Sequence, residues 1–137
     1  MPQGLETERL RLRPLGPEDA PRIRLLAGDE AVSATALGIP FPLTEEDANE
    51  WVREAQQGLA AGKEYAFALI DQESGEMIGS AALTLGAPAN RRAELGYWIG
   101  RPYWGRGYAT EAAACLLQFG FGRLNLCLLY TSPSPRD

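Results

Sequence analysis

The chain has 137 residues and a formal net charge of −5, with 45% hydrophobic and 23% charged residues. This composition is typical of one globular domain with a real core, and the acidic balance argues against a surface that coats nucleic acid, which needs a basic patch. The sequence contains no histidine, so Ser-His and Cys-His nucleophilic mechanisms and histidine metal sites are excluded.

The first half of the chain predicts one strand followed by two helices. Leucine and arginine alternate over residues 8–15, which is typical of a half-buried strand. A proline and two acidic residues open a predicted helix over residues 17–28. Residues 31–43 mix serine, threonine, glycine and proline and are expected to form a loop. A threonine followed three residues later by an aspartate then starts a second helix, over residues 44–61.

The second half is dominated by strands. Strands are predicted over residues 65–70, 77–85 and 93–99, a helix over 105–122, and a last strand over 124–130. Consecutive strands joined by hairpins pair antiparallel. The chain therefore predicts a mixed α/β fold of the α+β kind, with a mostly antiparallel central sheet flanked by helices, and not an all-parallel doubly wound sheet.

The most informative stretch joins the predicted strand at 93–99 to the helix that follows. It runs YWIGRPYWGRGYATE over residues 97–111, with Gly-x-Gly at the strand-to-helix corner. The two glycines allow the backbone to approach a ligand closely, and the first helical turn offers N–H groups at the positive end of the helix dipole. Such a corner suits a phosphate or pyrophosphate. The alternative is a structural turn whose glycines serve packing.

The element order and four sequence blocks resemble the GNAT superfamily of acyl-CoA-dependent N-acetyltransferases, and in finer pattern its RimJ/RimL-like branch of ribosomal-protein N-terminal acetyltransferases. The blocks are TERLRLR at residues 7–13, Ile-Gly at 78–79, AELGYWI at 93–99 and YWGRGYATEA at 103–112. One departure is Pro102, which stands where the superfamily signature begins with glutamine or arginine.

The resemblance covers about residues 1–126, which are identified as an incomplete GNAT domain. Residues 127–137 do not resemble the family, and the Ser-Pro-Ser-Pro run in them has no periodicity. We therefore expect a chain truncated at its C-terminus, which lacks the helix and strands that complete the sheet in family members.

The resemblance implies acetyl-CoA as co-substrate. In family members the backbone of the Gly-x-Gly corner binds the pyrophosphate, and the strand before the corner splays from its neighbour and binds the pantetheine arm. Arginines at the corner would add charge-assisted contacts to the phosphates. The residues implied to bind the cofactor are Trp98, Ile99 and Gly100 for the arm, and Arg101, Gly105, Arg106, Gly107, Tyr108, Ala109 and Thr110 for the pyrophosphate.

Glu94 is the candidate catalytic residue. Acetyl transfer requires a neutral amine, so some group must accept the amine's proton directly or through water. With histidine absent, a strand glutamate whose pKa is raised by burial is a plausible base, and family members carry a glutamate at the matching place in that role. A structural or surface glutamate is the alternative. Glu111, near the positive end of the helix dipole, is expected to be structural, and Cys115 to be a small core residue.

The resemblance thus implies direct transfer of an acetyl group from the thioester to a primary amine, on a protein N-terminus or a small molecule. The alternative is a non-catalytic acyl-CoA-binding module or an inactive truncated fragment. The two cysteines fit neither a disulfide framework nor a metal site, and no window approaches the ~20 apolar residues of a membrane span. We therefore expect a cytoplasmic enzyme with no metal, nucleic-acid or membrane partner. The sequence does not indicate the acceptor, the general acid or the oligomeric state.

Overall fold

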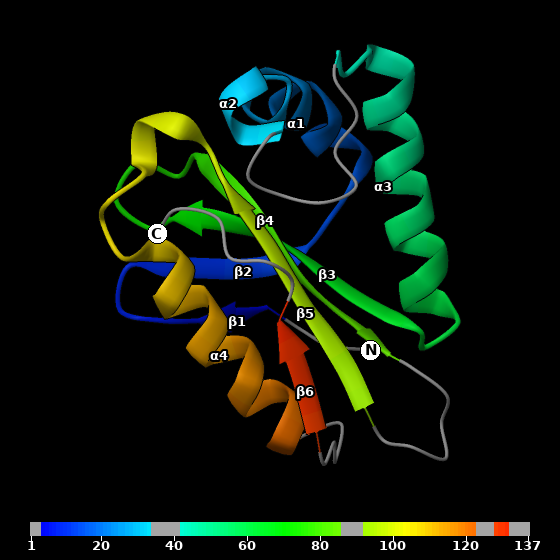
Figure 1. Ribbon diagram of the computed structural model, residues 1–137, viewed down its shortest axis with the longest axis vertical. Helices are drawn as coiled ribbons and strands as arrows, with labels where there is room; N and C mark the ends of the chain where they lie inside the picture. Colours follow the sequence, from blue (N-terminus) through cyan, green and yellow to red (C-terminus); the bar gives the residue numbers. More distant parts are fainter. Residues whose placement is uncertain (1–3, 34–41, 86–91, 123–127, 132–137) are drawn as a thin grey trace.

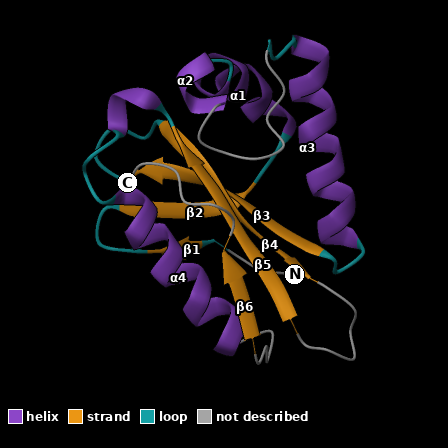
Figure 2. Cartoon of the chain, viewed as in Figure 1, coloured by secondary structure: helices purple, strands orange, loops and turns teal. Residues whose placement is uncertain are grey.

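The structure, a computed structural model, describes residues 4–33, 42–85, 92–122 and 128–131. The strands are β1 (Leu5–Glu6), β2 (Leu10–Pro14), β3 (Glu64–Asp71), β4 (Met77–Leu85), β5 (Arg92–Ile99) and β6 (Leu128–Thr131), and the helices are α1 (Ala20–Ala27), α2 (Glu30–Ser33), α3 (Glu45–Ala60) and α4 (Tyr108–Gly122). Two 3-10 turns, Pro17–Asp19 and Arg101–Tyr103, precede α1 and follow β5. The sheet lies between α4 on one face and α1, α2 and α3 on the other (Figures 1 and 2).

The sheet follows the chain order. Neighbouring strands from β1 to β5 pair antiparallel, and β6 is added beside β5 in the parallel direction. Parallel strands need a crossover connection, which α4 provides here. The predicted mixed, mostly antiparallel sheet flanked by helices is therefore confirmed. Of the predicted last strand, residues 128–130 lie in β6 and residues 124–127 lie outside the described residues.

Alternation along the strands gives each face of the sheet its own hydrophobic core. Leu10 and Leu12 of β2 are fully buried on the α4 face, where Phe67 of β3 meets Phe119 of α4 edge to face with ring centroids 5.8 Å apart. Trp98 of β5 is buried on the opposite face, among residues of α1 and α3. Because burial of apolar surface is the main stabilising contribution, both helical layers hold the C-terminal end of β5 in place.

Two helix boundaries differ from the sequence-based expectation. The expected loop over residues 31–43 begins inside the short helix α2. The helix expected from Gly105 starts only at Tyr108, because Gly105 and Gly107 have φ angles of +77° and +79°, which a right-handed helix does not allow. The segment from 101 to 107 is therefore a corner of its own between β5 and α4.

Candidate active site

The two glycines of the corner are required by its backbone conformation. Both Gly105 and Gly107 lie in the left-handed region, which side chains other than glycine rarely adopt. A Cβ at Gly105 would meet nothing within 4 Å, so the backbone there borders open space. A Cβ at Gly107 would lie 3.5 Å from Nη2 of Arg9. The corner thus presents bare backbone to a ligand.

The start of α4 adds N–H donors beside these glycines. The N–H of Glu111 donates to the carbonyl of Gly107 at 3.1 Å, so the N–H groups of Tyr108 and Ala109 precede the regular helical ladder. The side chains of Tyr108 and Ala109 are buried in the core on the α4 face, so only their backbone can reach a ligand. Thr110 is exposed on the same turn. This arrangement is typical of anion-binding sites at helix N-termini.

The turn before the glycines is held by contacts within the protein. The indole Nε1 of Trp104 donates to the carbonyl of Ile99 at 2.8 Å. The N–H of Gly100 donates to the carbonyl of Ile78 at 2.8 Å, and a Cβ at Gly100 would lie only 2.9 Å from Leu26 of α1. Gly100 therefore permits close packing of the turn on α1, and its N–H is already engaged with β4.

The end of β5 lies where a pantetheine arm is expected. β5 runs from Arg92 to Ile99 and pairs with β4 up to its last residue, where Ile99 stands opposite Gly79. The side chain of Trp98 packs edge to face on Trp51 of α3, with ring centroids 5.9 Å apart, and that of Ile99 is buried on the other face. Trp98 is therefore a core residue on the α1 and α3 face of the sheet.

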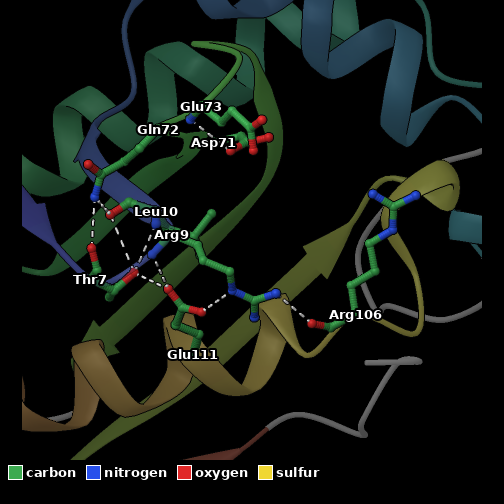
Figure 3. A network of polar contacts seen from close by, with 8 residues as sticks. All are labelled: Thr7, Arg9, Leu10, Asp71, Gln72, Glu73, Arg106 and Glu111. Atoms are coloured by element: carbon green, nitrogen blue, oxygen red, sulfur yellow. Dashed lines mark hydrogen bonds and ion pairs between the residues drawn. The ribbon is translucent and has the colours of Figure 1, made fainter.

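The two arginines of the corner are exposed. Arg101 lies 3.7 Å from Asp29 and keeps 63% of its side-chain surface exposed. Arg106 is exposed next to Gly105 and Gly107, and its carbonyl faces Arg9 (Figure 3). Exposed guanidinium groups beside an N-terminal helix site favour binding of a phosphate-containing ligand.

Glu94 lies near the start of β5 and its side chain is exposed, so the expected burial is wrong. It stands opposite Thr84 of β4 and, across the parallel pair, opposite Tyr130 of β6. At the rise of an extended strand it lies about 16 Å from Ile99 along β5. Thr84 and Glu94 are cross-strand neighbours, and both side chains are exposed. Trp98 lies on the same face of β5, four residues further along, and is buried among residues of α1 and α3. The carboxylate is thus open to an acceptor but separated from the glycine corner.

Glu64 was missed by the sequence analysis. It is half-buried on β3, opposite Thr84, and therefore lies in the same row across the sheet as Glu94. Burial and repulsion from Glu54 raise the pKa of Glu64, and a hydrogen bond with Thr84 lowers it in part. Glu64 is the first residue of β3, one residue before the strand predicted over 65–70, and it carries no motif, so only the pairing of β3 with β4 identifies it.

Glu111 is the centre of a structural network, as expected (Figure 3). Its carboxylate accepts hydrogen bonds from the Thr7 hydroxyl, from the Arg9 N–H at 2.8 Å and from Arg9 Nε at 2.6 Å. Burial alone would raise the pKa of Glu111. The hydrogen bonds and the charge of Arg9 lower it by more than this, so the pKa lies below its ordinary value. The network ties the first turn of α4 to the β1–β2 connection.

Glu111→Gln should lower the free energy of unfolding at pH 7 by about 1–2 kcal/mol, because an amide loses the charge-assisted hydrogen bonds. A carboxylate with a lowered folded-state pKa stabilises the fold above its unfolded-state pKa, and this stabilisation is lost as the pH falls through the folded-state value. The difference from wild type should therefore shrink below about pH 4. Urea unfolding at pH 7 and pH 3 measures it, and an undiminished difference at pH 3 would contradict the assignment.

Three further observations concern the part of the chain that the structure describes. Within the described ranges, no group of three or more histidine, cysteine, aspartate or glutamate side chains is placed to hold a metal ion. None of the helices there is long and apolar enough to cross a membrane. Burial raises the pKa of the half-buried Cys115 thiol, with a further contribution from Glu111, which disfavours the reactive thiolate.

Comparison with known proteins gives matches both in sequence and in structure. Residues 9–136 match the family model described as acetyltransferase (GNAT) domain. The chain is 32% identical over 133 residues to the uncharacterized N-acetyltransferase p20 of Bacillus licheniformis, covering 97% of this chain and 74% of that protein.

Solved structures show the same fold. An acetyltransferase from Agrobacterium tumefaciens str. C58 superposes with a TM-score of 0.74 and 31% identity, over 92% of this chain and 71% of the other. RimL, a ribosomal L7/L12 alpha-N-protein acetyltransferase solved in complex with coenzyme A, superposes with a TM-score of 0.78 and 18% identity, over 90% and 71% of the two chains.

Proposed function

Because the chain belongs to the GNAT acetyltransferase family, we propose that it transfers the acetyl group of acetyl-CoA directly to a primary amine, on a protein N-terminus or a small molecule. Acetyl-CoA-dependent acetylation follows from the family, whereas the amine acceptor and the RimJ/RimL-like branch are parts of the proposal. The observation that carries it is the pair of left-handed glycines that opens onto the start of α4.

The corner suits the pyrophosphate of acetyl-CoA. The space beside Gly105 is open, and the backbone from Gly105 to Ala109 would supply N–H donors at the positive end of the α4 dipole. Arg101 and Arg106 are exposed and would add contacts to the phosphates, as would the Thr110 hydroxyl. The fold shared with RimL, which was solved with coenzyme A, supports this assignment.

The end of β5 would bind the pantetheine arm. An arm that follows β5 back from the corner would run along Ile99 and Trp98 toward Glu94, because these residues follow one another in that order along the strand. Gly100 would contribute through the shape of its turn, since its N–H already donates to Ile78. This direction would bring the thioester to the side of Glu94.

Glu94 would act on the acceptor. A protonated amine must lose a proton before its nitrogen can form a bond to the thioester carbonyl carbon, and the carbon–sulfur bond then breaks to release the thiol. Glu94 is exposed and carries a carboxylate that can accept this proton directly or through a water molecule. The acceptor is therefore expected at the open side of β5 near Glu94.

A thiol-release assay tests the proposed function. Wild-type protein is incubated with acetyl-CoA and a panel of peptides and small amines, and calorimetry measures coenzyme A binding in parallel. We expect binding and amine-dependent thiol release. Binding without release for any amine would favour a non-catalytic acyl-CoA-binding module or an inactive fragment, and absence of binding would contradict the proposal.

A further inference from the structure

Arg9 connects the β1–β2 segment to the glycine corner and to the first turn of α4 (Figure 3). Its Nε donates to Oε1 of Glu111 on α4 at 2.6 Å, and its Nη1 donates to the carbonyl of Arg106 at 2.8 Å. The guanidinium also lies over the ring of Tyr108, 4.4 Å from the ring centroid. One side chain thus contacts the loop, the first residue of α4 and the first helical turn.

The contact with Arg106 determines the direction of a backbone N–H. In a planar trans peptide the C=O and the N–H point in opposite directions. The carbonyl of Arg106 points toward Arg9, so the N–H of Gly107, which belongs to the same peptide, points away from Arg9. Gly107 has a φ of +79° and no side chain to restrict it, so this hydrogen bond is a main restraint on that peptide.

We propose that Arg9 is a positioning residue for the cofactor: it orients the Arg106–Gly107 peptide so that the Gly107 N–H faces the pyrophosphate of acetyl-CoA. This inference rests on the proposed function, since it assumes acetyl-CoA at the corner. Arg9 acts through the peptide and does not itself touch the cofactor.

The surroundings of Arg9 favour this indirect role. A hollow of about 310 Å³ beside Arg9 is lined by Glu8, Asp71 and Glu73 together with Gln72 and Tyr108. Three carboxylates repel a phosphate, so the pyrophosphate is expected on the opposite side of the loop, where the Gly107 N–H points. The exposed part of the Arg9 side chain therefore faces a hollow lined by carboxylates and not the expected phosphate site.

Hydrogen bonds from the β3–β4 turn hold the backbone around Arg9. The N–H of Gln72 donates to the carbonyl of Arg9 at 2.9 Å, and the Gln72 side chain donates to the carbonyls of Thr7 at 2.7 Å and Leu10 at 2.9 Å. The β3–β4 turn thereby holds the backbone on both sides of Arg9. The planar fork of an arginine donates from two separate nitrogens, Nε to Glu111 and Nη1 to the Arg106 carbonyl, whereas the three donors of a lysine lie on one nitrogen and cannot reproduce this geometry.

The test compares Arg9→Met and Arg9→Lys with the control Arg11→Met. Arg11 lies on the same segment, is 58% exposed and pairs with Glu6 at 3.4 Å, away from the corner. For each protein, kcat/KM is measured with acetyl-CoA and with S-acetylpantetheine, which has the thioester and the arm but no pyrophosphate. The amide resonance of Gly107 is followed by NMR in the protein without ligand.

We expect both Arg9 variants to lose about tenfold in kcat/KM with acetyl-CoA, mainly through KM, and to stay within about twofold of wild type with S-acetylpantetheine. The Gly107 amide resonance should shift or broaden in both variants and stay unchanged in Arg11→Met. A lysine variant equal to wild type would show that charge alone matters, and an equal loss with both thioesters would show a general structural role. Either result would overturn the inference.

Failure of the inference can be told apart from failure of the proposed function. A wild-type chain that binds no acetyl-CoA contradicts the proposed function and with it the role of Arg9 toward the cofactor. Normal acetyl-CoA kinetics in wild type together with an unchanged Gly107 resonance in Arg9→Met contradicts only the role of Arg9.

Discussion

Glu94→Gln should lower turnover about a hundredfold, while the affinity for acetyl-CoA changes little. The amide cannot accept the proton of the acceptor amine, so only water or a poorer base would be left to do so. Glu94 lies about 16 Å along β5 from Ile99 and the glycine corner, so its loss should not disturb the phosphate contacts. Steady-state kinetics and calorimetry on the folded variant measure the two quantities.

The pH dependence of this variant is equally specific. A carboxylate base produces an acidic limb in the rate–pH profile, because its protonated form is inactive. The glutamine variant should lack this limb. An unaltered profile would mean that water or another residue accepts the proton.

Glu64→Gln is the matched control for Glu94→Gln. Glu64 lies in the same row across the sheet, on β3, and burial together with repulsion from Glu54 raises its pKa. If Glu64→Gln abolished the acidic limb and Glu94→Gln did not, the base would have been assigned to the wrong carboxylate. We expect Glu64→Gln to retain both the limb and most of the turnover.

The parts of the fold that could be predicted depend on signals within a few residues. Thr44 and Asp47 form the expected capping box, in which the Asp47 N–H donates to the Thr44 hydroxyl at 3.0 Å and the Thr44 N–H to the Asp47 carboxylate at 3.1 Å. The alternation of Leu10 and Leu12 with arginines places both leucines in the core. Such patterns involve only residues close together in the sequence, so they can be recognised without knowledge of the tertiary structure.

The parts that could not be predicted depend on contacts between distant segments. Arg9 and Glu111 are 102 residues apart, and nothing local to either residue indicates the other. Glu94 is exposed because α1 and α3 cover the other end of this sheet face. The position of these helices on the sheet cannot be deduced from the sequence of β5. The glycine corner was predicted because its signal is continuous in sequence, but the direction of the Gly107 N–H is set by Arg9 from the other end of the chain.

Gly107→Val should weaken binding of acetyl-CoA at least tenfold, about 1.4 kcal/mol. The β-branched side chain is strained at a φ of +79°, so the corner would have to change its backbone conformation. Its Cβ would also lie 3.5 Å from Nη2 of Arg9, so the added methyl groups would disturb the hydrogen bond that Arg9 donates to the Arg106 carbonyl. Both effects move the Gly107 N–H away from the position that binds a phosphate.

Gly75→Val separates this effect from a general loss of stability. Gly75 has a φ of +76°, and a Cβ there would meet nothing within 4 Å, so valine introduces the same backbone strain in the turn between β3 and β4. Thermal unfolding should show destabilisation in both variants, because the left-handed conformation disfavours valine in each. Calorimetry should show weakened acetyl-CoA binding only in Gly107→Val. Unchanged affinity in folded Gly107→Val would mean that the corner does not bind the pyrophosphate, and equal losses in both variants would assign the effect to stability and not to the site.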